Sequence, residues 1–315
     1  MINVWRRGGC LVPSKHRLMK ENIVIEIEKI DFSHWAVREY IEQILLVHPL
    51  QPGVPIEFVQ FPQSHELLVL NIGYRPKSAA AETEGQECRH FFCGKTESRE
   101  AYSTTIEKPL CIVQFKPHAW YAFSKSRTER LKNRVVKLEC DIGSCLRTFV
   151  SKYLPEYLFR LLRWERARER SYQSIPSMLN YIEKHISTVS VASLAEAFRI
   201  SEATLRRYFK KYIGMNANAY IRNQKVKRMT VRIYNNDYNI HSVQECGFYD
   251  QSHFIREFRR VYATTPTKYI QNLRNLFSES RHTEWLFRAC YLGCDGEIPA
   301  PVPAYASSIP EAFSI

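Results

Sequence analysis

The sequence lacks the features that mark membrane and exported proteins. No stretch approaches the roughly 20 consecutive apolar residues of a membrane span, and the basic start from Met1 to Lys20 has no apolar signal-peptide core. We therefore expect a cytoplasmic protein with no membrane partner. Because Met19 begins a cleaner amphipathic stretch, Met1 and Met19 both stay open as the true start, and residues 1–21 are interpreted as a flexible arm.

Patterns that carry catalysis are also missing. The chain has no glycine-rich phosphate loop, no metal-ligand spacing and no nucleophile motif. Its nine cysteines are scattered, odd in number and without the CxxC spacing of a zinc site. Such usage is typical of a reducing compartment. The sequence therefore predicts no enzyme activity, no catalytic residues, no metal and no cofactor.

The charge of the chain is strongly basic and unevenly distributed. The formal net charge is +13 over 315 residues, which favours an anionic partner, either nucleic acid or an acidic membrane surface. The segment from Gln173 to Asn275 holds 16 Lys or Arg against 7 Asp or Glu, so it carries +9 of that charge. The basic excess is thus concentrated in one third of the chain.

Apolar periodicity divides the chain into a β-rich half and a helical part, which predicts an α+β fold. Short runs rich in Val, Ile and Phe, separated by Pro, Gly and Ser, predict strands at Ile23 to Ile27, Ile56 to Phe61, Leu67 to Ile72 and Cys111 to Phe115. A helix is predicted at Trp35 to Leu46. We assign residues 22–140 to a β-rich domain of a sensing or dimerising kind.

From Asp141 the periodicity becomes helical. Pro155 is expected to end the first helix, and another is predicted from Leu158 to Tyr172. The mixed-charge run from Arg163 to Arg170 is interpreted as a solvated helix face, with a linker or a DNA-backbone contact as the alternative. We assign residues 141–172 to a helical linker, 173–275 to an all-α domain and the Pro-rich residues 276–315 to a flexible tail.

Ser190 to Gly214 has the pattern of two short amphipathic helices joined by a tight corner at Arg199 to Ser201. Ser190 and Ser201 are expected to cap them, because a serine side chain accepts a hydrogen bond from the unpaired N–H groups at a helix start. Ala195 supplies the small side chain that a crossing helix needs. This arrangement predicts a helix-turn-helix unit.

The second helix of this unit has one apolar and one basic face. By 3.6-residue spacing, the buried stripe consists of Leu205, Tyr208, Phe209 and Tyr212. The outward side chains are Glu202, Ala203, Arg206, Arg207 and Lys210. An exposed Arg pair suits a major-groove reader, since Arg can bond guanine O6 and N7 together. The alternative is an ordinary solvated basic helix.

The same plan recurs from Ile240 to Val261, with Val243 at the crossing position, Gly247 at the corner and Asp250 as the cap. Its inner stripe is Phe254, Phe258, Val261 and Tyr262. The side chains that begin or flank its outer face are Gln251, Ser252, His253, Ile255 and Arg256. A repeated unit predicts a double helix-turn-helix domain.

Further helices are expected around the two units. Asn218 to Tyr234 is interpreted as one long basic helix that holds the units apart. Thr265 followed by Pro266 marks a helix start, with Pro at the first helical position and Tyr269 packing inward. A helix before the first unit is indicated by Met178, Leu179, Ile182 and Ile186.

Three stretches, LAEAFRISEATLRRYFKK, GMNANAYI and ECGFYDQSHFIREFRRVYATTPTKY, carry a resemblance to a known family. The last is similar to its signature GF-x-x-x-S-x-F-x-x-x-FK-x-x-x-G-x-TP-x-x-Y. The region from Ile175 to Leu273 therefore resembles the DNA-binding domain of AraC/XylS-type transcription regulators. Departures from the pattern are Ala263 where Gly is usual, Lys225 where Arg is common, and Met229 and Val243 where Ala is usual.

This resemblance implies a sequence-specific DNA-binding transcription regulator, with activation and repression both open. It implies base-reading positions at Ala203, Arg206 and Arg207 in the first recognition helix, to which Ser201 and Lys210 are added as contacts. In the second helix, the implied positions are Gln251, Ser252, His253 and Arg256. Double-stranded DNA is the implied partner; RNA polymerase, a small-molecule effector and a second copy of the chain are compatible further partners.

The N-terminal half contains LLVLNIGYRP and PLCIVQFKPHAWYAF, which resemble a β-rich domain of some AraC-type regulators. The resemblance implies a sensing or dimerising module. An aromatic cluster in this half has two interpretations, an apolar ligand pocket or plain core. Its members are Phe115, His118, Trp120, Tyr121 and Phe123.

Two rival functions stay open at this point. One known arrangement joins an AraC-like domain to cysteine methyl-transfer chemistry in DNA repair, and nine cysteines are compatible with it; against it, no Cys-His active-site motif is present. The other rival is an RNA-binding or membrane-surface protein that uses the same positive charge, although no aromatic RNP-type strand signature is found.

Overall fold

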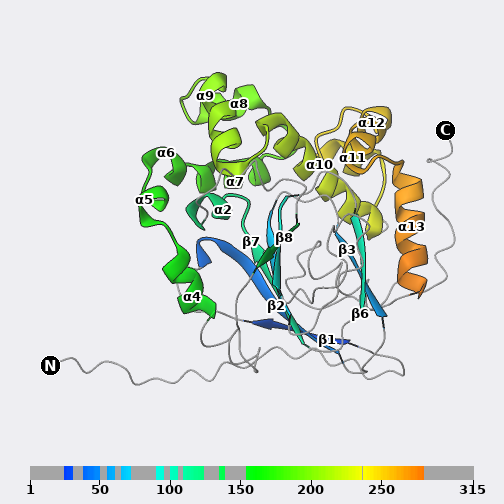
Figure 1. Ribbon diagram of the computed structural model, residues 1–315. Coiled ribbons are helices and arrows are strands. Elements are labelled where there is room, and N and C mark those ends of the chain that lie inside the picture. Colours follow the sequence, from blue (N-terminus) through cyan, green and yellow to red (C-terminus); the bar gives the residue numbers. More distant parts are fainter. Residues whose placement is uncertain are drawn as a thin grey trace, which may run out of the picture.

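The computed structural model describes residues 25–30, 38–49, 55–60, 65–71, 90–95, 100–105, 109–123, 135–138, 154–235 and 237–279. Of these residues, those in the first half of the chain form mainly β-strands and those in the second half form helices (Figure 1). The predicted α+β fold, with strands first and an all-helical region after them, is confirmed.

The strands are short and follow the apolar runs of the sequence. They are β1 (Ile25–Ile30), β2 (Ile41–Pro49), β3 (Pro55–Gln60), β4 (Leu67–Asn71), β5 (His90–Cys93), β6 (Glu100–Thr105), β7 (Leu110–Phe115) and β8 (Val135–Leu138). β1, β3, β4 and β7 coincide with the four predicted strands to within a few residues.

The strands pair in two antiparallel sheets. The larger sheet has the order β1-β2-β7-β4-β5-β8, and β3 pairs with β6 in a smaller one. All six residues of the inner strand β7 are buried, and an uninterrupted apolar run such as LCIV suits a strand covered on both faces. This strand forms the middle of the N-terminal core.

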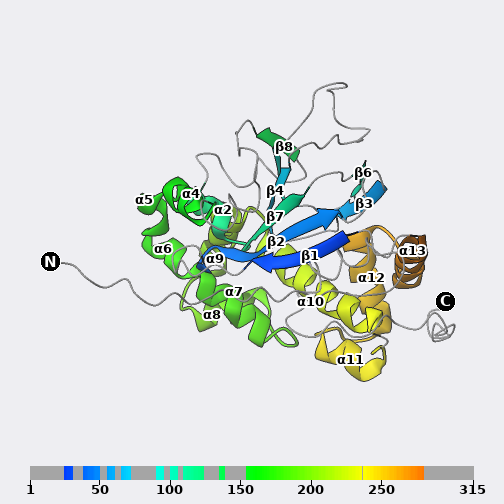
Figure 2. The same ribbon diagram turned by 90° about the horizontal axis from the view of Figure 1, so that it is seen from below.

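The helices occupy the space beside the larger sheet. They are α2 (Ala119–Phe123), α4 (Leu154–Leu161), α5 (Trp164–Ala167), α6 (Arg170–Gln173), α7 (Ile175–Lys184), α8 (Val191–Ala197), α9 (Glu202–Tyr208), η3 (Phe209–Ile213, a π-helix), α10 (Ala217–Tyr234), α11 (Ile240–Glu245), α12 (Gln251–Tyr262) and α13 (Pro266–Glu279). In Figure 2, α8 and α9 lie near one end of α10, and α11, α12 and α13 lie near the other.

The buried hydrophobic residues form two clusters. One runs from Tyr40 in the N-terminal half through α2 and α4 to α10, and ends at Ile221. The other begins at Val226 in α10 and ends at Leu273 in α13. The division between them therefore falls within α10. The first helix-turn-helix unit shares one core with the N-terminal sheet, whereas the second unit has a core of its own.

Some predictions are wrong or shifted. The predicted helix at Trp35 to Leu46 is wrong over Ile41 to Leu46, because these residues belong to strand β2. The single helix predicted from Leu158 to Tyr172 is divided into α4, α5 and α6, with Pro155 in the first turn of α4, where proline is tolerated. Helix α13 continues to Glu279, beyond the limit set at Asn275. Residues 1–21 and 280–315, and the helix indicated from Asp141, lie outside the described residues.

Candidate nucleic-acid interface

The first helix-turn-helix unit consists of α8 and α9, and both helices begin at the predicted caps. The N–H of Ser193 donates to Ser190 Oγ at 3.0 Å, and the N–H of Ser190 donates back to Ser193 Oγ at 2.9 Å. At the second helix, the N–H of Thr204 donates to Ser201 Oγ at 3.1 Å. Each cap satisfies donors that a helix start leaves unpaired, so the corner between the helices is fixed locally by sequence.

The inner face of α9 follows the predicted stripe. Leu205, Phe209 and Tyr212 are buried and Tyr208 is half-buried. Ala195, at the crossing point in α8, is also buried. After Tyr208 the helix continues as η3. This π-helix is capped at its C-terminal end by Gly214, whose φ is +80°. Since η3 continues α9 without a break, whatever holds η3 also fixes the direction of α9.

The outer face of this unit is exposed and basic. All of the residues predicted to contact DNA there are exposed, namely Ser201, Ala203, Arg206, Arg207 and Lys210. Arg206 is also engaged within the helix, because its Nη2 lies 2.7 Å from Glu202 Oε2. This ion pair would compete with DNA for the Arg206 guanidinium. Sequence reasoning missed it, although the i,i+4 spacing of Glu202 and Arg206 indicates such a pair.

The second unit repeats this arrangement with α11 and α12. Asn239 caps α11 in a reciprocal arrangement with Ser242, and Asp250 caps α12 by accepting the N–H of His253 at 2.6 Å. Gly247 stands at the corner with φ +81°. A Cβ there would lie 2.6 Å from the carbonyl oxygen of Ser187, so only glycine fits this corner.

The two faces of α12 are separated as predicted. The inner stripe of Phe254, Phe258, Val261 and Tyr262 is buried. Of the four positions predicted to contact DNA, Ser252 and Arg256 are exposed, and Gln251 and His253 are half-buried. The His253 ring also has a structural partner, because its Nδ1 accepts the backbone N–H of Tyr249 at 3.3 Å. This contact helps to fix the turn that leads into α12.

Two exposed apolar side chains in the second unit were missed by sequence reasoning. Tyr249 is 85% exposed and Ile240 is 59% exposed, and both precede or begin a helix of the unit. The burial of a turn residue depends on the path of the chain, so composition alone gave no signal for them. Tyr249 stands directly before Asp250, the cap of α12, so its exposure adds apolar surface at the start of that helix.

Helix α10 joins the two units, as predicted for the long basic helix. Its apolar anchors are all buried, namely Tyr220, Ile221, Val226, Met229 and Ile233. Lys225 on this helix donates from Nζ to the carbonyl oxygen of Gly247 at 3.3 Å. α10 therefore spans both clusters and is tied to the corner of the second unit.

One departure from the family signature has a structural consequence. Ala263 ends α12 with φ 54°, in the left-handed region. This is the conformation for which glycine is preferred at a helix end, so the alanine adds strain where glycine would not. After it, α13 begins at Pro266 as predicted, and Tyr269 is buried.

The aromatic cluster of the N-terminal half packs as core. Phe115, His118 and Tyr121 are buried, and Trp120 and Phe123 are half-buried and packed against the same cluster. The ring of Trp120 lies 3.9 Å from that of Phe92. Trp120 to Phe123 lie in helix α2, which follows strand β7 in the chain. These contacts favour the plain-core interpretation over the pocket.

Metal clusters and membrane-spanning helices are not found among the described residues. Within those ranges, no group of three or more His, Cys, Asp or Glu residues is arranged to hold a metal ion. None of the helices in the same ranges has the length and apolar character needed to span a bilayer.

Comparison with known proteins identifies the C-terminal region. A family model described as a helix-turn-helix domain matches residues 194–272. An uncharacterised HTH-type transcriptional regulator of Bacillus subtilis, YdeC, is 23% identical over 64% of this chain and 74% of its own length. The activator RhaS of Pectobacterium carotovorum is 28% identical over 30% of this chain and 34% of its own length, so this chain matches only about a third of RhaS.

Among solved structures, ToxT from Vibrio cholerae is similar over 72% of this chain and 97% of its own, with 10% identity and a TM-score of 0.38. The curated relatives share a function class, because they are transcriptional regulators with a helix-turn-helix domain. The double helix-turn-helix architecture described above and the matched family model agree. Residues 194–272 therefore form a helix-turn-helix domain of the AraC/XylS type.

Proposed function

We propose that the protein binds duplex DNA sequence-specifically, with α9 and α12 in successive major-groove segments about 34 Å apart, one turn of B-DNA. The observation that carries this proposal is the repetition of one capped, exposed and basic recognition helix in two units joined by α10. α10 has 18 residues, which span about 27 Å at about 1.5 Å per residue. A rigid spacer of this length suits two readers on one face of a duplex.

The exposed side chains suggest a division of labour. Arg206 and Arg207 on α9, and Arg256 on α12, are proposed to choose bases through bidentate bonds to guanine. Gln251 suits an adenine, and Ala203 offers only contact with a thymine methyl group. Ser252 and His253 are the remaining proposed DNA contacts of α12. Ser201 and Lys210 are proposed to bind phosphates, and such contacts position the protein without reading sequence.

Tyr249 is proposed as an additional contact. Its side chain is 85% exposed and stands directly before Asp250, the cap of α12. When α12 enters a groove, the start of the helix lies close to the sugar-phosphate backbone, where backbone and hydroxyl donors meet phosphate oxygens. The Tyr249 hydroxyl is thus in a position to donate to a phosphate.

The remaining assignments are proposals of the same kind. We propose that residues 22–140 act as a sensing or dimerising domain, residues 141–172 as a linker and residues 173–275 as the DNA-binding domain, between an arm at 1–21 and a tail at 276–315. A small-molecule effector, RNA polymerase and a second copy of the chain are the proposed further partners. A DNA-binding regulator of this type needs no catalysis and works in the cytoplasm.

Selection from random duplex oligonucleotides tests the proposal. The expected result is a recovered motif with two conserved half-sites, bound with an affinity that falls steeply as salt rises. Parallel binding to RNA of equal length and to anionic vesicles separates the rival functions. Equal affinity for all three anions, or no recovered motif, contradicts the proposal. Exposure to alkylated DNA followed by mass spectrometry tests the repair alternative, for which a methylated cysteine is required.

A further inference from the structure

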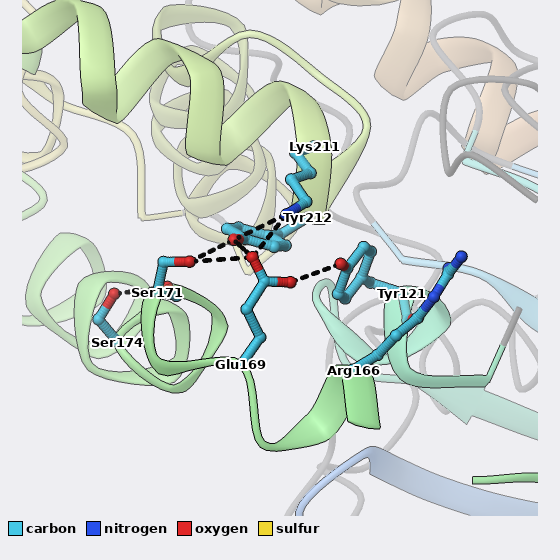
Figure 3. A network of polar contacts seen from close by, with 7 residues as sticks. All are labelled: Tyr121, Arg166, Glu169, Ser171, Ser174, Lys211 and Tyr212. Atoms are coloured by element: carbon cyan, nitrogen blue, oxygen red, sulfur yellow. Dashed lines mark hydrogen bonds and ion pairs between the residues drawn. The ribbon is translucent and has the colours of Figure 1, made fainter. Parts of the chain in front are cut away.

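Glu169, in the turn between α5 and α6, joins the N-terminal half to the first helix-turn-helix unit (Figure 3). Its Oε2 accepts a hydrogen bond from the hydroxyl of Tyr121 in α2 at 2.6 Å. Its Oε1 accepts from the hydroxyl of Tyr212 at 2.6 Å and from Lys211 Nζ at 2.5 Å, both in η3. Ser171 Oγ donates to the same oxygen at 3.1 Å. One carboxylate thus bridges α2 and η3.

The electrostatics of this network keep Glu169 charged. Partial burial acts to raise the pKa of Glu169, but hydrogen bonds from Lys211, Tyr121, Tyr212 and Ser171 outweigh burial and lower that pKa to about 2. For Lys211, burial acts to lower the pKa, whereas hydrogen bonds to Glu169 and Tyr212 raise it above its ordinary value. Both groups are therefore ionised at neutral pH, and the hydrogen bonds are charge-assisted and stronger than neutral ones.

Ring packing surrounds the same point. The rings of Tyr121 and Tyr212 meet edge to face, with centroids 4.8 Å apart. Tyr172 lies 5.2 Å from Tyr121 and 5.6 Å from Tyr212. The guanidinium of Arg166 lies 5.0 Å from the centre of the Tyr121 ring. Aromatic pairs and a cation over a ring at these distances add attraction beyond simple burial. Ring contacts therefore also hold together Tyr121 and Tyr212, the two tyrosines that donate to the Glu169 carboxylate.

A second connection reaches η3 from the sheet. Lys95 follows strand β5 and is buried, and its Nζ lies 3.1 Å from Glu66 Oε1. The same Nζ donates to the carbonyl oxygen of Pro117 at 2.8 Å and to that of Ile213, the last residue of η3. Two independent links therefore hold η3, and with it α9, on the N-terminal half.

The second unit forms its ion pairs differently. Arg232 in α10 binds Glu245 in α11 at 2.5 Å and Asp237 at 3.2 Å. Arg222 lies 3.8 Å from Glu257 in α12. These pairs stay within the helical region, and the buried cluster of the second unit contains no residue before Val226 among the described residues.

We propose that Glu169 is a positioning residue for DNA binding, which fixes the first recognition helix on the N-terminal domain through Tyr121 on one side and Tyr212 and Lys211 on the other. This inference rests on the proposed function. The orientation of α9 is then set by the N-terminal domain, whereas α12 follows α10. Loss of the Glu169 bridge therefore affects the first half-site and leaves the contacts of the second half-site in place.

The test uses the full chain and a duplex selected by the unaltered protein. The variant Tyr121→Phe removes one hydroxyl and keeps the ring, and Glu169→Gln removes the charge and keeps the size. The matched control is Glu245→Gln, which removes an ion pair with Arg232 inside the second unit. Footprints of the variant Arg207→Ala identify the half-site that α9 contacts.

The expected result is selective. Tyr121→Phe and Glu169→Gln should weaken protection of the α9 half-site about three- to tenfold, the value of one or two hydrogen bonds, and leave the α12 half-site unchanged. Glu245→Gln should leave the α9 half-site unchanged. Equal weakening of both half-sites, or no weakening, overturns the inference.

A measurement without DNA separates this inference from the proposed function. Hydrogen exchange of the full chain should become faster in peptides that cover η3 in both variants, with exchange in α12 unchanged. Unchanged exchange in η3 overturns the inference whether or not DNA is bound. If the unaltered protein selects no duplex, the proposed function fails, and the exchange result alone still decides whether Glu169 holds η3. Tyr121→Phe is the mildest change and remains informative if Glu169→Gln does not fold.

Discussion

The two helix-turn-helix units share one local plan but differ in what they pack against. Both have a capped first helix, a tight corner, a capped recognition helix and a buried aromatic stripe. The first unit shares its hydrophobic core with the N-terminal sheet, whereas the second unit has a separate core. The difference shows that two copies of one motif can have the same local structure and yet pack against different parts of the molecule.

The largest effect should come from the buried pair that ties the sheet to the first unit. Burial acts to raise the pKa of Glu66, and the charge of Lys95 opposes this. Lys95→Met leaves the carboxyl of Glu66 without its ion-pair partner, and breaking a buried pair costs about 3 to 5 kcal/mol. Urea unfolding of the full chain measures the loss.

The matched control is the double variant Lys95→Met with Glu66→Met. Replacing both partners by apolar side chains should recover much of the free energy of unfolding, because no unpaired charge is then buried. A single variant that is as stable as the original protein would contradict the role given to this pair.

The next effect concerns the corner of the second unit. Gly247 has φ +81°, and a Cβ there would lie 2.6 Å from Ser187 O and 2.8 Å from Ile186 O. Gly247→Ala should cost about 2 to 4 kcal/mol, since it combines backbone strain with overpacking. Thermal unfolding measures this, and footprinting should show the loss first at the α12 half-site. A greater loss of protection at the α9 half-site than at the α12 half-site would contradict this expectation.

Smaller effects are expected for the arginines that are proposed to read bases. Arg207→Ala and Arg256→Ala should each cost about 1 to 3 kcal/mol of binding and relax discrimination at one base position, in different half-sites. Lys210→Ala is the matched control, because Lys210 is proposed to contact a phosphate. Loss of a phosphate contact weakens binding to all sequences alike and reduces the slope of log affinity against log salt by about 1. Binding titrations over a panel of single-base variants measure both. An unchanged base preference in either Arg variant would show that the replaced arginine does not read a base.

The smallest effect should be stabilising. Ala263 ends α12 at φ 54°, and glycine adopts this conformation without strain. Ala263→Gly should therefore stabilise the second unit by about 0.5 to 1 kcal/mol. Ala195→Gly, inside α8, should change stability in the opposite direction, because glycine weakens a helix interior. Calorimetric melting compares the two variants, and a destabilised Ala263→Gly would show that the alanine is not strained.

The local plan of the helical region was predictable because it depends on neighbouring residues. Ser190, Ser201 and Asp250 cap the helices to which the sequence assigned them. The aromatic stripes and the corner glycine also follow from spacing of three or four residues. The roles of Arg206 and Arg256 as base readers stay a prediction, although both side chains are exposed on helices, as the proposal requires.

Features that depend on distant residues were not predictable. Ile41, Ile44 and Leu45 have helical spacing, but the strand β2 pairs with β1 and β7 and is buried nearly throughout, so tertiary pairing overrides the local pattern. Glu169 lies within the mixed-charge run interpreted as a solvated face. Its partners Tyr121 and Tyr212 are more than 40 residues away on either side, and no local pattern relates them.

The most direct test of the account is a hydroxyl-radical footprint of the full chain on a duplex recovered by selection. Two protected segments on one face of the duplex, about 34 Å apart, are expected, with protection of one segment depending on Arg207 and of the other on Arg256. A single protected segment that depends on both arginines, or protection that does not depend on sequence, would contradict the account.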